Sequence, residues 1–150
     1  MTNKIIMSIH AEHSHNIFEL KKDLELRKTA PKGGYPFIVY LYETKNSTYK
    51  GSGGVLFPGA GAVVGFFSCK AVVKTSAFGS ALLKGCSAEE DAVRALIAKR
   101  ACLAAEKIAA YANGGDIIGL EVSTPTRFPR PRPLSEFGLT RPPQSWQYLK

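Results

Sequence analysis

The chain has 150 residues, of which 45% are hydrophobic, and a formal net charge of +8 at pH 7. This length suits a single hydrophobic core, and the basic balance favours an acidic partner, with nucleic acid ahead of acidic protein. No stretch reaches the ~18 apolar residues of a membrane span, and the segment 1–7 is too short for a secretory signal. We therefore predict a cytoplasmic protein with no membrane partner, and leave homo-oligomerisation open.

The first elements are a strand and a helix. Ile5, Met7 and Ile9 alternate with polar residues, which predicts a short strand over 4–9. Farther along, the spacing of Asn16 and Glu19 is a helix start signal, and apolar residues then recur at helical spacing. The sequence predicts a helix over 16–28.

The middle of the chain is predicted to form an antiparallel meander of three strands. Residues 36–42 are apolar or aromatic at nearly every position, which is typical of an interior strand covered on both faces. A turn signal at 45–48 leads into a return strand over 49–57, and a second at 58–61 leads into a third strand over 62–73.

The strongest helix signal covers residues 87–112. Ser87 and Glu90 form a capping box, Asn113 begins a stop signal, and the 26 residues from 87 to 112 contain no Gly or Pro. A last strand is predicted over 116–122. The side of the helix away from the sheet carries the basic residues Arg94, Lys99, Arg100 and Lys107.

The segment 125–150 has an unusual composition. It holds six of the nine prolines and five of the twenty Lys and Arg residues, against one acid, Glu136. Because each proline removes a backbone donor and restricts φ, neither a helix nor a central strand is expected here. The sequence predicts an extended, basic, Pro-rich arm.

These elements predict an α+β fold. It has a mainly antiparallel sheet of about four strands, with two helices packed on one face, in the order (β)αβββαβ. Residues 1–124 form the single domain and residues 125–150 the C-terminal arm.

All three histidines fall within six residues, as His10, His13 and His15, with Glu12 among them. Imidazoles this close would supply two or three ligands to Zn²⁺, Ni²⁺ or Cu²⁺ if the loop folded around the ion. A polar connection between the first strand and the first helix is the simpler interpretation, and we predict no metal site. The cysteines form no C-x-x-C pair and are predicted to be buried free thiols: Cys69, Cys86 and Cys102.

The glycine clusters at 51–54 and 59–61 are predicted to be hairpin turns. A phosphate-binding loop requires a following helix, and both clusters lie among predicted strands. We therefore predict no cofactor. The sequence also lacks a G-x-S-x-G nucleophile motif, so an enzyme is the less favoured class of protein.

The order of a helix, three strands and an alanine-rich helix after Gly85-Cys86-Ser87 resembles a double-stranded-RNA-binding domain. The resemblance implies contact with RNA phosphates through lysines at the start of the second helix. In this chain residues 89–91 at that place are acidic.

The predicted strands are also similar to the first strands of the ribonuclease H fold, with residues 87–112 as its first helix. The resemblance implies two-metal chemistry on converging carboxylates. Glu43 and either Glu89 or Glu90 would take two of those places, and the last predicted strand is followed by Ser123-Thr124 without an acid.

We predict a non-enzymatic intracellular binding protein that engages an acidic partner, foremost nucleic acid, through the arm and the basic side of helix 87–112. The alternative is a protein-interaction or inhibitor module acting through a sheet edge or the arm. A third hypothesis is a metal-dependent enzyme using His10, His13 and His15. The predicted binding residues pair arginines and lysines for phosphates with aromatic rings for stacking: Arg94, Lys99, Arg100, Arg127, Arg130, Arg132, Arg141, Phe128, Trp146 and Tyr148.

Overall fold

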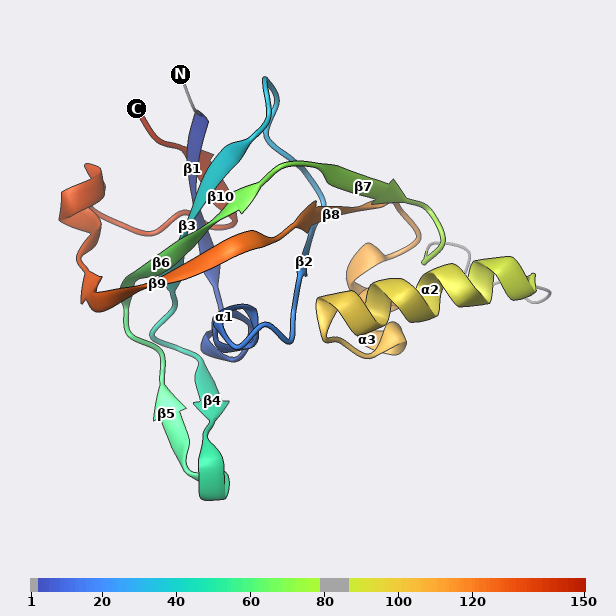
Figure 1. Ribbon diagram of the computed structural model, residues 1–150, viewed down its shortest axis with the longest axis horizontal. Coiled ribbons are helices and arrows are strands. Elements are labelled where there is room, and N and C mark those ends of the chain that lie inside the picture. The colour runs from blue at the N-terminus through green and yellow to red at the C-terminus, as the bar shows by residue number, and fades with distance from the viewer. Residues whose placement is uncertain (1–2, 79–86) are drawn as a thin grey trace.

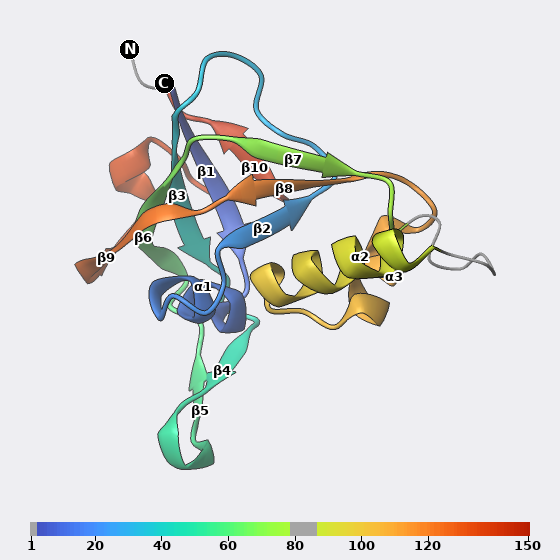
Figure 2. The ribbon, with the colours of Figure 1, turned by 45° about the vertical axis from the view of Figure 1, so that its right-hand side comes forward.

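A computed structural model describes residues 3–78 and 87–150, which form an α+β fold with a five-stranded and a three-stranded sheet. In Figures 1 and 2, α1 lies below the crossing strands, and α2 and α3 pack to one side. The elements run β1 (Asn3–Ile9), α1 (Ala11–Phe18), β2 (Leu24–Arg27), β3 (Phe37–Glu43), β4 (Thr48–Lys50), η1 (Ser52–Gly54), β5 (Leu56–Pro58), β6 (Ala62–Cys69) and β7 (Val72–Thr75). After these come α2 (Ala88–Ala101), α3 (Ala105–Ala112), β8 (Ile117–Glu121), β9 (Ser123–Arg132), η3 (Leu134–Phe137) and β10 (Trp146–Tyr148).

The five-stranded sheet has the order β10-β1-β3-β6-β9. β1 and β3 run parallel, while β10, β6 and β9 each pair antiparallel with their neighbours. The predicted strands at 4–9 and 36–42 are confirmed, and β3 is an interior strand. One face of this sheet buries the larger core, to which α1 contributes Ile17; the sheet contributes residues such as Ile5, Met7, Val39, Leu41 and Phe67.

The three-stranded sheet has the order β2-β8-β7 and is antiparallel throughout. It packs α2 and α3 around a second core, in which Leu24 and Leu26 of β2 contact residues of both helices. The predicted strand at 116–122 is confirmed as β8. Thus α2 and α3 pack on the three-stranded sheet, whereas α1 packs on the five-stranded sheet.

The first helix lies earlier than predicted. α1 ends at Phe18, and Leu20 has a left-handed φ of 63°, which stops the helix. Residues 24–27, predicted as the last helical turn, form β2 because they pair with β8 and bury Leu24 and Leu26. Tertiary pairing here outweighs a local helical pattern.

The predicted helix over 87–112 is two helices. Its start is confirmed, because Ser87 Oγ accepts a hydrogen bond from the Glu90 N–H at 3.1 Å. Its stop at Asn113 is confirmed by a left-handed φ of 48°. Between them Cys102 has a φ of 56° and ends α2, so that α2 and α3 both face the second core.

The predicted meander is wrong beyond its first strand. β4 and β5 pair only with each other among the described strands, and they form a ribbon that projects from the body in Figures 1 and 2. The predicted strand at 62–73 divides into β6 and β7, which belong to different sheets. Of the predicted buried thiols, Cys69 is buried and Cys102 is exposed, while Cys86 lies outside the described residues.

Residues 125–150 are not an arm. β9 pairs with β6 at the edge of the larger sheet, where prolines cost no ladder hydrogen bond, and β10 pairs with β1. Between them Leu134, Phe137 and Leu139 pack on the second face of the sheet. The predicted fold of about four mainly antiparallel strands with a free arm is therefore wrong. The element order also differs from the helix, three strands and helix on which the resemblance to a double-stranded-RNA-binding domain rests.

No helix in the described part of the chain is long and apolar enough to cross a membrane.

Candidate functional site

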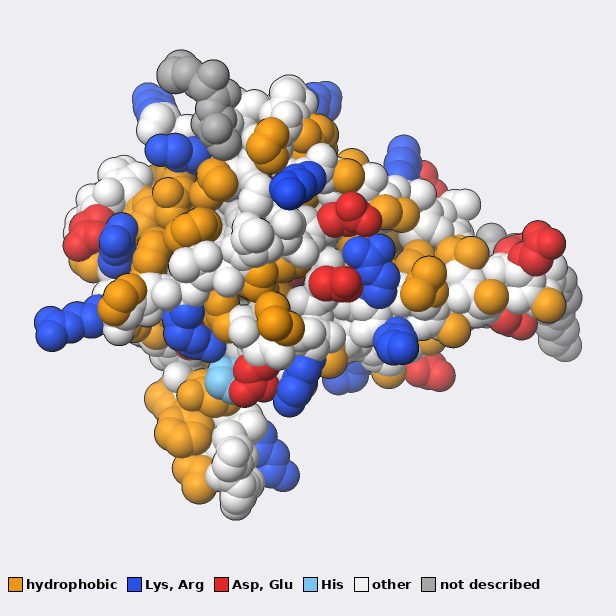
Figure 3. Space-filling model, in the orientation of Figure 1, with side chains coloured by type: hydrophobic (Ala, Val, Ile, Leu, Met, Phe, Trp, Pro, Cys, Tyr) orange, Lys and Arg blue, Asp and Glu red, His pale blue; other side chains and the backbone are white. Residues whose placement is uncertain are grey.

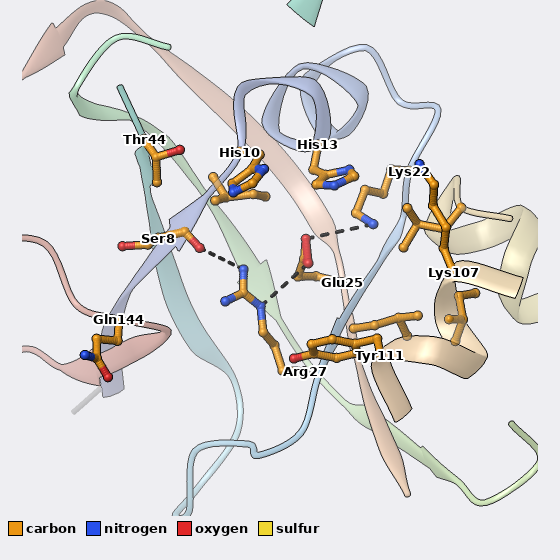
Figure 4. A pocket seen from close by; sticks show the side chains of 14 residues that line it. Ser8, His10, His13, Lys22, Glu25, Arg27, Thr44, Lys107, Tyr111 and Gln144 are labelled. Carbon is orange, nitrogen blue, oxygen red and sulfur yellow. Dashed lines mark hydrogen bonds and ion pairs between the residues drawn. The ribbon is translucent and has the colours of Figure 1, made fainter. Parts of the chain in front are cut away.

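A cavity of about 410 Å³ opens between the two sheets and α3 (Figure 4). The end of β1 and the start of α1 form one wall, β2 forms the floor, and α3 closes the opposite wall. This size is in the usual range for a small-molecule site. Polar and charged side chains from these elements line it: Ser8, His10, His13, Lys22, Glu25, Arg27, Thr44, Lys107, Tyr111 and Gln144.

Three charged side chains are buried together at the floor of the cavity. The side chains of Lys22, Glu25 and Arg27 are 1%, 8% and 13% exposed. Lys22 Nζ lies 3.9 Å from Glu25 Oε2, and Arg27 Nε lies 3.6 Å from Glu25 Oε1. Burying charged groups costs free energy, which pairing and hydrogen bonds only partly offset. A buried cluster of three charges therefore suggests a functional role.

Backbone and side-chain acceptors orient both cations. Arg27 donates from Nη2 to the Ser8 carbonyl at 2.8 Å and from Nη1 to Ser145 Oγ at 3.2 Å. Lys22 donates to the Ala101 carbonyl at the end of α2, at 2.5 Å. The cluster therefore connects β1, β2, α2 and the segment before β10.

Two polar atoms of this cavity have no hydrogen-bond partner within residues 3–78 and 87–150. Among the described residues no group donates a hydrogen bond to Glu25 Oε2, and none pairs with Nδ1 of His13, although both atoms are buried. Buried polar atoms in native proteins are nearly always satisfied, so each exception calls for a cause. Both atoms belong to side chains that line the same cavity.

His13 is held in its neutral form. Burial, followed by the positive charge of Lys22, lowers the pKa of His13 below its ordinary value of 6.5. Its ring stacks on that of His10, with the ring centroids 6.3 Å apart. At neutral pH the imidazole therefore offers the cavity one N–H donor and one acceptor nitrogen.

This lowered pKa predicts a loss of folding stability in mild acid. Since the pKa of His13 is lower in the folded than in the unfolded chain, the unfolded chain binds more protons between the two values. The contribution of His13 should be complete above pH 6.5 and decline as the pH falls from 6.5 through the folded pKa. Urea unfolding at about pH 7.5 and 5.5 should show a smaller decline in His13→Gln than in the parent, and equal declines would contradict this prediction. The charged groups that act on the ring are Lys22, Glu25, Glu12 and His10.

The mouth of the cavity combines a ring with positive charge. Tyr111 of α3 is 42% exposed, and Lys28 Nζ lies 5.1 Å from the centroid of its ring. Lys107, one turn earlier on α3, is also exposed. The Tyr111 ring could stack on a planar ligand, and Lys28 and Lys107 could pair with an anionic group.

The predicted basic side of the helix is partly engaged in ion pairs. Arg94 is buried and pairs with Asp91 and Glu90. Arg100 lies 3.0 Å from Asp23 and 3.4 Å from Glu121, while Lys99 is exposed. The structure does not join these residues into one basic surface.

The predicted binding residues of the C-terminal segment are spread over β9, β10 and the loop before β10. Arg127 lies over the ring of Phe18 at 4.5 Å, and Arg132 lies over that of Phe128 at 4.1 Å. Trp146 donates to Thr29 Oγ1, and the Tyr148 hydroxyl accepts from the Lys32 N–H. Arg130 and Arg141 are exposed. On the face shown in Figure 3, lysine and arginine side chains are dispersed among acidic and hydrophobic ones.

The three histidines do not converge. His10 and His13 line the cavity, whereas His15 stacks on Tyr49 at 4.1 Å and lies 2.9 Å from Glu19. Within residues 3–78 and 87–150 no group of three or more His, Cys, Asp or Glu side chains is arranged to hold a metal ion.

Sequence reasoning missed Lys22, Glu25 and Arg27 because they fall in the wrongly predicted helix. The signal was present: Leu24 and Leu26 alternate with Glu25 and Arg27, which is the period of a strand. In the structure the leucines face the second core and the two charged residues line the cavity on the other side of the strand.

The fold and cavity define an α+β protein with a buried charged site at the junction of two sheets. No protein-family model matches the chain, and no curated protein matches its sequence. The structure is similar to the crystal structure of ASCH from Zymomonas mobilis, with a TM-score of 0.71 and 18% identity over 98% of this chain and 87% of that one. It is equally similar in fold to crystal structures of two mutants of that protein, at 17% identity. The shared feature is the fold.

These findings correct the functional prediction. The structure replaces the arm with edge strands and divides the long helix, and the similar solved structures are ASCH proteins. The predicted mode of binding through the arm and helix 87–112 is therefore wrong, and so are the arm-based interaction module and the histidine metal enzyme.

Proposed function

We propose that this protein binds a nucleotide in the cavity between the sheets and α3, either free or as one unit of a strand. The observation that carries the proposal is that Glu25 and His13 line one cavity and that a buried atom of each, Glu25 Oε2 and His13 Nδ1, has no hydrogen-bond partner among the described residues. A bound ligand would satisfy both atoms and offset the cost of burying them.

Charge and shape narrow the ligand to this class. Lys22 and Arg27 outnumber Glu25, and Lys107 adds a further cation, so the cavity favours a ligand with an anionic group. The ring of Tyr111 suits a planar partner. A nucleotide combines a planar, hydrogen-bonding ring with a phosphate, and a volume of about 410 Å³ is large enough for it.

The test is calorimetric titration with the four ribonucleoside monophosphates and with a short single-stranded RNA. We expect at least one mononucleotide to bind, and Glu25→Gln to weaken it roughly tenfold through the lost acceptor. Lys107→Ala, at the exposed mouth, should weaken nucleotides more than the matching nucleosides because it removes a cation near the phosphate.

A matched control makes the same chemical change elsewhere. Glu136 is exposed on η3 and pairs at 3.9 Å with Arg132, outside this cavity. Glu136→Gln should leave nucleotide affinity unchanged. The proposal fails if no nucleotide binds to folded protein, or if Glu25→Gln and Glu136→Gln alter affinity equally.

A further inference from the structure

The helix α2 carries apolar residues on two of its sides. Ile97 and Ala101 are buried in the second core. On another side of the helix, Val93 and Leu96 are 45% and 59% exposed. Figure 3 shows hydrophobic side chains along α2 and acidic ones towards its outer end. One apolar side of α2 therefore lies at the surface of the protein.

The first half of α2 projects from the body of the protein. Every residue from Ala88 to Val93 is exposed, and in Figure 1 this end of the helix extends beyond α3. Short helices are marginal in water, and most of their stability in proteins comes from packing of an apolar side. A second helix packed against Val93 and Leu96 would therefore stabilise this part of α2.

The surface residues of α2 have the spacing of a helix pair. Glu89, Val93, Leu96 and Arg100 are separated by four, three and four residues, as are the contact positions of a two-helix coiled coil. A twofold axis between residues 94 and 95 would set Val93 of each copy opposite Leu96 of the other. The same axis would set Glu89 opposite Arg100 and its neighbour Lys99. Such a contact is self-complementary, as the interface of a twofold dimer must be.

The charges along α2 favour the antiparallel orientation. Its first turn is acidic and its last turn is basic: Glu89, Glu90, Asp91, Lys99 and Arg100. Antiparallel copies bring the acidic turn of each helix against the basic turn of the other, whereas parallel copies would place like charges together. Because Arg100 already pairs with two carboxylates of its own chain, the exposed Lys99 is the better partner for Glu89 of a second copy.

We propose that this protein forms a homodimer through α2, with the two copies of the helix packed antiparallel around Val93 and Leu96. Neither these two residues nor Glu89 and Lys99 line the cavity, so the proposal is independent of nucleotide binding. A contact limited to one pair of helices buries less than the roughly 1,200 Å² of a standard interface. We therefore expect a dimer that dissociates when the protein is diluted.

The test is sedimentation velocity of the full chain from about 1 to about 200 μM, because dimerisation follows mass action. The average mass should rise from 16.3 kDa towards twice that value. Leu96→Glu should raise the dissociation constant at least about tenfold, since it places a charge in the apolar contact. Leu56→Glu is the matched control, because Leu56 is 64% exposed on the β4–β5 ribbon, away from α2, and it should leave the dissociation constant unchanged. Thermal melts establish that both variants are folded.

Mixing two charge-reversal variants tests the orientation. Glu89→Lys sets a lysine against Lys99 of the second copy, and Lys99→Glu sets a glutamate against its Glu89. Each variant alone should therefore dimerise about fivefold more weakly than the parent. Mixed in equal amounts, the two variants should associate as tightly as the parent, because both contacts of the mixed dimer again join a lysine to a glutamate.

Three results would overturn the proposal. The first is a parent protein that stays monomeric over the whole concentration range. The second is a dimer that Leu56→Glu weakens as much as Leu96→Glu, since association would then not depend on α2. The third is a mixture that associates no more tightly than either charge-reversal variant alone, which would exclude the antiparallel pairing.

Discussion

Replacing Gly65 with alanine is expected to destabilise the protein by about 3 kcal/mol, because the added methyl group would overlap atoms of β9 and of α1. Gly65 lies in β6, where β9 crosses it with an irregular register. A Cβ atom at this position would lie 2.3 Å from the Thr126 carbonyl oxygen and 2.6 Å from the ring of Phe18. The backbone oxygen cannot rotate away, so β9 or α1 would have to shift.

Chemical denaturation of the variant and the parent measures this cost. Gly34→Ala is the matched control: Gly34 is exposed, and no described atom lies within 4 Å of the Cβ that alanine would add. That variant should stay within about 0.5 kcal/mol of the parent. Equal unfolding midpoints for Gly65→Ala and the parent would show that β6 and β9 separate easily.

Replacing Lys22 with methionine is expected to cost about 3 kcal/mol of folding stability. The change keeps the length of the side chain and removes the ammonium group, which is 1% exposed, donates to the Ala101 carbonyl and lies 3.9 Å from Glu25. Removing one member of a buried pair leaves the other charge without compensation, which is more damaging than removing both. The end of α2 would also lose its hydrogen bond to the floor of the cavity.

Two further variants make this prediction specific. Lys21→Met changes the adjacent residue, whose side chain is 64% exposed and pairs with Glu19, and it should cost less than about 1 kcal/mol. The double variant Lys22→Met with Glu25→Gln should be more stable than the sum of the two single losses predicts. Additive losses would show that Lys22 and Glu25 do not interact, and would weaken the case for a coupled charged site.

Stability and ligand affinity separate the roles of these residues. Lys22 both supports α2 and faces the cavity, so its loss affects folding first. Lys107 is exposed at the mouth, and its replacement should act on binding alone. Comparing the two variants therefore tests whether the buried cluster is structural or is available to a ligand.

Several elements followed from the sequence alone because their signals are local. The alternation in 4–9 and the apolar run in 36–42 predicted β1 and β3, and both strands form at those places. The cap at Ser87 and the stop at Asn113 depend on side chains and backbone within one turn of the helix ends. Such interactions need no partner from elsewhere in the chain.

Only the tertiary structure decided the remaining elements. Residues 24–27 become β2 because β8, almost a hundred residues later, supplies hydrogen bonds and a core for Leu24 and Leu26. The proline-rich segment becomes β9 because β6 offers it an edge, where the missing donors cost nothing. The candidate site has the same origin, because Lys22, Glu25 and Arg27 form a site only together with residues of α1, α2 and β1. Partners distant in sequence determine which of two locally acceptable conformations buries more apolar surface, and a local pattern carries no information about them.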